Sequence, residues 1–161
     1  MSTTTTPTKL AAAMFGPNLD GTATDVVRFL AEAGYLWYYR GQFDQAVTVF
    51  KAVALLSPSS PVAQLGLAEV YLSQGKFREA DKAAETAGRS DGADRRTMAL
   101  AYTLRGRALV QLNRAKDAEK SLQRAAEVDP DGEQGKAANE ILEAARKAGI
   151  FPASAAAPQG K

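Results

Sequence analysis

The sequence predicts an all-α protein built from repeated pairs of helices. Alanine, the residue that favours helix most strongly, contributes 32 of the 161 residues. A pattern of small and aromatic residues recurs with a period of 34 residues. Glycine, asparagine or proline interrupts the chain at regular intervals, as expected where helices end. The length suits one compact domain and is too short for two ordinary enzyme domains.

The repeated pattern is clearest in two consecutive segments. In each, a small residue is followed three positions later by an aromatic residue, and then by glycine, an aromatic residue and alanine. The two sets are Gly34, Trp37, Gly41, Phe43, Ala46 and Ala68, Tyr71, Gly75, Phe77, Ala80. A third, weaker copy contains Tyr102, Gly106 and Ala118, and four residues are inserted before it near 95–98.

Antiparallel pairs of helices explain this pattern. Small residues let two helices cross closely, and large apolar residues fill the space beside the crossing. We therefore expect the aromatic residues of the pattern, with Phe50, to belong to the core. The expected crossing pairs are Gly34 with Ala46, Ala68 with Ala80, and Gly106 with Ala118.

Turn and cap residues divide the helices. Gly41 and Gly75 supply left-handed backbone between the two helices of a pair, and Asn113 is the best non-glycine residue for the same place. Ser60 is expected to cap the helix that Pro61 opens. A further helix is expected to begin with a capping box made by Asp131 and Gln134 and to end near residue 147.

These motifs resemble the tetratricopeptide repeat. The matching repeats are residues 27–60, 61–94 and 99–132, although Arg105 stands where an apolar residue is usual. The resemblance implies three helical hairpins in a right-handed superhelix. An amphipathic helix over residues 133–148 would then cap the open apolar end of the stack.

The repeat domain is expected to span residues 24–149. Residues 1–23 contain a threonine run and several helix breakers, so they are expected to form a flexible arm. Residues 150–161 are expected to form a disordered tail. Met14 and Phe15 are apolar residues of the arm that could occupy a groove of the same chain or anchor a dimer.

Composition excludes several classes of function. The chain has no histidine and no cysteine, which removes imidazole catalysis, thiolate nucleophiles and the usual zinc sites. Its net charge of +2 comes from mixed signs on helix faces, which does not suit nucleic-acid binding. No apolar run is long enough to span a bilayer or to act as a secretory signal. We expect a cytosolic protein with no cofactor, no metal and no enzymatic activity.

The first helix of each pair should line the concave face of the stack, where residues at i, i+4 and i+7 share one side. These offsets predict a groove that is aromatic at one end and aliphatic in the middle, with two single charges. Its residues are Ala31, Tyr35, Tyr38, Tyr39, Val62, Leu65, Glu69, Leu72, Leu100, Thr103, Arg107 and Val110.

Two questions about the groove stay open at this point. Tyr35 and Tyr38 either contact a ligand or pack beneath the arm or a second subunit. Glu69 and Arg107 either contact a ligand, pair with one another or lie solvated at the rim. An apolar groove with tyrosines suits an extended, mostly apolar peptide.

Among tetratricopeptide repeat proteins, the sequence is similar to the small bacterial chaperones of type III secretion. That resemblance implies a chaperone that shields an apolar segment of a translocator or needle-type protein, as a homodimer, a heterodimer or a monomer. The carboxylate clamp of heat-shock co-chaperones is missing, because the matching positions are Ala31, Tyr35, Gly66, Leu100 and Leu104. The alternative is a general scaffold or adaptor in a bacterial cell-envelope or regulatory assembly.

Overall fold

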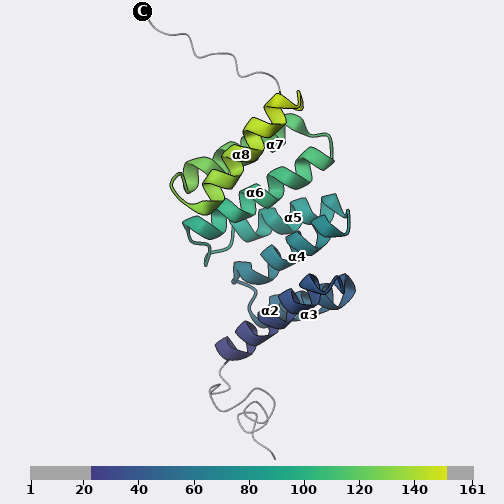
Figure 1. Cartoon of the computed structure of the whole chain (residues 1–161). Helices are drawn as coiled ribbons and strands as arrows, with labels where there is room; N and C mark the ends of the chain where they lie inside the picture. The colour runs from purple at the N-terminus through teal and green to yellow at the C-terminus, as the bar shows by residue number, and fades with distance from the viewer. Residues whose placement is uncertain (1–22, 152–161) are drawn as a thin grey trace, which may run out of the picture.

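The computed structural model describes residues 23–151, and helices make up most of this part of the chain (Figure 1). No strand occurs between residues 23 and 151. In chain order the helices are α2 (Ala23–Tyr39), α3 (Phe43–Leu56), α4 (Pro61–Ser73), α5 (Phe77–Gly88), α6 (Arg95–Gln111), α7 (Ala115–Val128) and α8 (Glu133–Lys147).

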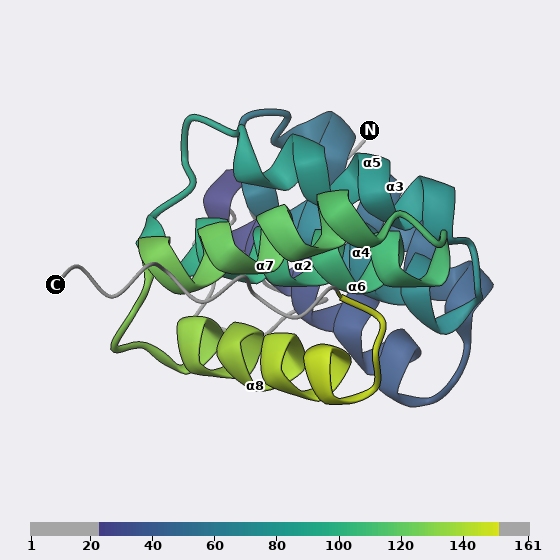
Figure 2. The ribbon, with the colours of Figure 1, turned by 90° about the horizontal axis from the view of Figure 1, so that it is seen from above.

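The helices pair into hairpins that stack in chain order. Helix α2 packs on α3, α4 on α5 and α6 on α7, while α8 packs against α6 and α7. Figure 1 shows the stack running from the α2–α3 hairpin at one end to α8 at the other. Seen along the stack in Figure 2, α8 runs beside the last hairpin. The predicted fold of three hairpins and a terminal helix is confirmed.

The turns between the paired helices confirm the predicted backbone. Gly41 and Gly75 have φ of 72° and 71°, and Asn113 has φ of 57°. In this region an ordinary side chain is strained, so glycine or asparagine is favoured. Ser60 caps α4 as expected, with its Oγ accepting a hydrogen bond of 3.4 Å from the backbone nitrogen of Val62.

The predicted capping box at the last helix is wrong. Helix α8 begins at Glu133 with Gly132 as its N-cap, and no side chain caps it. The chain turns tightly after α7, where the Gly132 nitrogen donates to the Asp129 carbonyl over 3.2 Å. The Asp129 carboxylate lies against Gly132. This turn moves the helix start past Asp131.

Phe50 is the central residue of the first core. Its side chain is fully buried and lies between α2 and α4. A Cβ placed on Gly34 would lie 2.9 Å from the ring, and one placed on Gly66 would overlap it. In the same way, a Cβ placed on Gly106 would meet Leu122. The expected crossings of Gly34 with Ala46 and of Gly106 with Ala118 stay predictions, and both alanines are fully buried.

Two apolar clusters form the interior. The first joins the first two hairpins to α6 and includes Phe50, Leu65, Leu67, Val70 and Leu104. Trp37, Phe43 and Tyr71 pack against it while partly exposed, and Tyr102 packs in this way against the second cluster. The second cluster lies between α6, α7 and α8 and includes Leu109, Leu122, Leu142 and Phe151.

Phe151, within the tail predicted for residues 150–161, is packed against the last helices. Phe151 is 2% exposed and belongs to the second cluster. Its backbone nitrogen donates to the carbonyl of Ala145 over 3.4 Å. Burial of this ring holds the chain against α8, so residue 151 is not part of a disordered tail. Ala23, the last residue of the arm predicted for 1–23, begins α2. Residues 1–22 and 152–161 lie outside the described residues.

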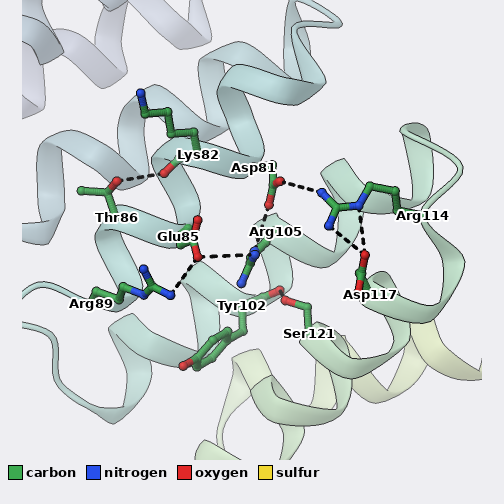
Figure 3. Close-up of polar contacts among 10 residues, drawn as sticks. All are labelled: Asp81, Lys82, Glu85, Thr86, Arg89, Tyr102, Arg105, Arg114, Asp117 and Ser121. Carbon is green, nitrogen blue, oxygen red and sulfur yellow. Dashed lines mark hydrogen bonds and ion pairs between the residues drawn. The ribbon is translucent and has the colours of Figure 1, made fainter.

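Ion pairs join the second hairpin to the third, as Figure 3 shows. Arg105 on α6 donates to Asp81 on α5 over 2.9 Å and lies 3.6 Å from Glu85. Arg114 lies 3.5 Å from Asp81 and 2.8 Å from Asp117. The charged residue that departs from the repeat pattern at position 105 is therefore matched by carboxylates on the preceding hairpin.

The close approach of Phe50 to Gly66 leads to a testable prediction. We expect Gly66→Ala to lower the free energy of unfolding by up to about 2 kcal/mol, because overpacking costs about 1–3 kcal/mol and helix propensity returns about 1 kcal/mol. Urea denaturation measures this change. Gly88→Ala is the matched control, since its Cβ would lie 3.4 Å from that of Ala101, an ordinary contact. Equal effects of the two substitutions would contradict the packing described above.

Candidate binding groove

Two neighbouring hollows share two lining residues, and together they are called the groove. The first has a volume of about 180 Å³ and is lined by Tyr38, Tyr39, Glu69, Leu72, Ser73 and Arg107. The second has a volume of about 460 Å³ and is lined by Leu72, Phe77, Arg107, Val110, Gln111 and Ile141. Leu72 and Arg107 line both hollows, so the groove runs from α2 across α4 and α6 to α8.

Helix geometry places these residues together. The groove residues of α2, α4 and α6 lie in the last two turns of each helix. They are therefore gathered at the C-terminal ends of these three helices. Glu69 and Leu72 are three residues apart, as are Arg107 and Val110, and this spacing puts each pair on one helix face. The groove therefore follows directly from the stacking of the first helices.

Tyrosine side chains form one end of the groove. Tyr39 is 79% exposed, and its ring centre lies 5.3 Å from that of Tyr38 and 6.4 Å from that of Tyr35. The Tyr38 hydroxyl lies 3.2 Å from Ser73 Oγ, within hydrogen-bond distance. Tyr35 packs edge-on against Phe50, with ring centres 5.0 Å apart. Tyr35 thus supports the core, while Tyr38 and Tyr39 present aromatic surface to the groove.

Glu69 and Tyr35 form a half-buried polar pair beside the groove. Burial raises the pKa of the Tyr35 hydroxyl well above its usual range, and the negative charge of Glu69 adds to this effect. Burial also raises the pKa of Glu69, although the hydrogen bond donated by Tyr35 and the positive charge of Arg107 oppose the shift. Tyr35 is therefore a hydrogen-bond donor to Glu69 rather than to a ligand.

The predicted groove residues divide into three groups. Tyr38, Tyr39, Glu69, Leu72, Arg107 and Val110 line the two hollows. Val62 and Leu100 lie near the starts of α4 and α6, away from both hollows. The remaining predicted residues other than Tyr35 are buried, namely Ala31, Leu65 and Thr103, which are 5–7% exposed.

Burial of Thr103 has a local cause. Its hydroxyl donates to the carbonyl of Ala99 one turn earlier, over 2.9 Å, which satisfies the hydroxyl inside the helix. Leu65 belongs to the first apolar cluster. These side chains can shape the floor of the groove, but they offer almost no surface to a partner.

Four lining residues were missed by the sequence analysis. Ser73 and Gln111 lie at the ends of α4 and α6, one residue past the last chosen positions, Leu72 and Val110. Phe77 had been assigned to the core, and Ile141 to the apolar stripe of the capping helix. The stripe was a usable signal, because a helix that closes the stack can also close one end of the groove.

Family models of the tetratricopeptide repeat match residues 38–101 and 99–131. Together these matches cover more than half of the chain. The chain is a tetratricopeptide repeat protein. Its helices form the superhelical stack of that family, a scaffold for binding protein or peptide partners. No helix among residues 23–151 has both the length and the apolar character needed to cross a membrane.

One curated relative shares a short segment with this tetratricopeptide repeat protein. Over 59 residues the chain is 39% identical to cellulose synthase operon protein C of Xanthomonas axonopodis pv. citri. The segment is 37% of this chain and 4% of the relative. The chain thus spans only a small part of the length of that protein.

Solved structures with the same fold come from several settings. The type III secretion translocator chaperone SycD of Yersinia enterocolitica, in an alternative dimer, has a TM-score of 0.69 at 21% identity, covering 78% of this chain and 95% of that one. A T3SS complex from Aeromonas hydrophila has a TM-score of 0.69 at 22% identity, with coverage of 89% and 97%. The first repeat domain of Spaghetti (RPAP3), bound to the HSP90 peptide SRMEEVD, has a TM-score of 0.66 at 24% identity, with coverage of 76% and 91%.

The Glu69 environment predicts a dependence of stability on pH. Because its pKa is raised in the folded state, the stability that Glu69 contributes is complete below its usual value of 4.5 and is lost as the pH rises through the raised value. Gln at this position cannot ionise and can still accept from Tyr35. We therefore expect Glu69→Gln to gain stability relative to the wild type between about pH 4 and pH 7.

Urea denaturation of both proteins at several pH values measures this difference. Glu140→Gln is the matched control, because Glu140 lies exposed on α8. A difference between Glu69→Gln and wild type that stays constant over this pH range would contradict the description of the buried pair.

Proposed function

We propose that this protein is a bacterial cytosolic chaperone whose concave groove holds an extended, mostly apolar segment of a partner protein, such as a translocator or needle-type substrate of type III secretion. The observation that carries the proposal is the pair of neighbouring hollows between Tyr39 and Ile141, which combine apolar anchors with polar side chains and only two single charges. Such a groove can mask a segment without chemical change, through pocketed side chains.

The lining mixes apolar and polar side chains and holds a single cation, so it suits a ligand with a few apolar anchor residues better than an acidic ligand. Leu72, Val110 and Ile141 offer aliphatic surface, and Tyr38 and Tyr39 add aromatic surface at one end. These side chains suit alternate apolar residues of an extended chain. The similarity in fold to SycD and to the Aeromonas hydrophila complex agrees with this role and supports it as analogy.

The groove offers little to a peptide with an acidic C-terminus. At the positions that match the carboxylate clamp, Ala31, Gly66 and Leu104 are buried and uncharged, and Leu100 is aliphatic. Arg107 is the single cation among the residues that line the two hollows, and Glu69 offsets its charge. The HSP90 peptide bound in the Spaghetti structure is therefore a poor candidate for this groove.

Replacing Tyr38 and Leu72 together by glutamate tests the groove. We expect the double variant to weaken binding of apolar peptides by at least about 30-fold, because two hot-spot contacts are lost and two charges are introduced. Fluorescence polarisation with labelled apolar peptides measures the affinity. The peptide SRMEEVD is the negative ligand, and we expect wild type to bind it more weakly than the apolar peptides.

Leu55→Glu is the matched control for the double variant. Leu55 is 83% exposed and lines neither hollow, so its replacement should leave affinity unchanged. Circular dichroism should show that the groove variant keeps its helicity, with a lower melting temperature because Tyr38 and Leu72 pack against the first apolar cluster. Loss of binding in Leu55→Glu with full binding in the groove variant would contradict the proposal and favour the alternative, a scaffold that uses its convex face.

A further inference from the structure

The first helix of each later hairpin uses one face to contact the preceding hairpin. On α4 this face contains Gly66, which receives the ring of Phe50 from α3, and Val70, which is fully buried. On α6 the residue in the same repeat position as Val70 is Ala108, also fully buried. Arg105, beside it, bonds Asp81 of α5. This face is therefore shaped to receive a helix.

The α2–α3 hairpin lies at the end of the stack opposite α8 (Figure 1), and among the described helices α2 contacts only α3 and α4. Leu36 holds the repeat position of Val70 and Ala108, yet it is 49% exposed. Val49 on α3 is half-buried, while its repeat equivalents Ala83 and Ser121 are 5% and 7% exposed. A hollow of about 340 Å³ lies beside these residues and is lined in part by Trp37 and Val49.

We propose that residues 9–15 of the same chain bind this face of α2 and take the place of the missing preceding helix. Residues 10–15 read LAAAMF, an apolar run whose three alanines suit close helix packing. At helical spacing Leu10 and Met14 would share one side. This side would cover Leu36, as Phe50 covers Gly66 in the next hairpin.

Charge complementarity supports this occupant. Glu32 is exposed on α2, one turn before Leu36 and on the same face. It makes no ion pair with any residue between 23 and 151. Lys9 adjoins the apolar run and is the single lysine or arginine among residues 1–22. The segment therefore brings one cation to a face that carries one unmatched carboxylate.

The connection is long enough and keeps the segment close. Residues 16–22 can span up to about 24 Å when extended. Leu36 lies about 20 Å along the axis from the start of α2, at 1.5 Å per residue. A connection of seven residues also gives a local concentration on the order of millimolar. Binding within one chain is therefore favoured over binding by a second copy at micromolar concentrations.

Disulfide trapping in the full chain tests the proposal, because the natural sequence has no cysteine. Met14→Cys is combined with Ala33→Cys on α2, or with Asn139→Cys on α8 as the control. With mild oxidant at micromolar concentration, we expect a disulfide within one chain to form faster in the Ala33 pair than in the Asn139 pair. Equal rates in both pairs, or disulfides only between chains, would overturn the proposal.

A charge exchange makes the test specific. We expect Lys9→Glu to reduce trapping of the Ala33 pair by about two- to fivefold, as for one exposed ion pair, and Glu32→Lys to restore it in the double variant. Thr5→Glu is the control for added charge. Equal effects of Lys9→Glu and Thr5→Glu, or no recovery with Glu32→Lys, would contradict the assigned pairing.

Light scattering gives the mass, and a dimer whose formation depends on Leu36 would identify a second copy as the occupant.

Discussion

The arrangement of the stack depends on one contact, the ring of Phe50 held between Gly34 and Gly66. The ring fills the space that side chains on these two glycines would take, so α2 and α4 both approach α3 closely. Leu122 makes the corresponding contact with Gly106 in the last hairpin. Because each contact joins neighbouring helices, the fold is a chain of local interfaces, as in other solenoids. A large side chain on one helix and a glycine on its neighbour therefore set how closely successive helices pack.

The groove is a consequence of this stacking. Close approach of the helices brings the last turns of α2, α4 and α6 to one level, and α8 closes the far end with Ile141. Tyr35 and Glu69 pair beside this surface, so the Tyr35 hydroxyl donates to Glu69 and not to a ligand. Binding surface and core are therefore shared, because Tyr38, Leu72, Val110 and Ile141 line the hollows and also pack, partly buried, against the two apolar clusters.

Much of the fold could be predicted because its signals are local. Helix ends follow from residues such as Gly41 and Asn113, whose left-handed backbone depends on the residue itself. The first residue of α8 could not be predicted, because it depends on the tight turn in which Asp129 lies against Gly132. Burial of Phe151 was also missed, since it requires the surface made jointly by α6, α7 and α8.

The groove was predicted less completely than the fold, for a geometric reason. Counting positions along each first helix identifies which side of the helix faces the groove. It does not tell whether a side chain on that side is exposed or buried. Leu65 and Leu72 share one side of α4, yet only Leu72 reaches the hollows. Depth depends on the neighbouring helices and their tilt, which a single sequence pattern does not contain.

The central claim is that the concave groove is the binding surface, and methyl NMR of the full chain tests it most directly. Titration with an extended apolar peptide should shift the methyl signals of Leu72, Val110 and Ile141, which line the groove. The signals of Leu55 and Leu56, exposed at the end of α3, should stay in place. Shifts confined to Leu55 and Leu56 would contradict the account and move the binding surface away from the groove.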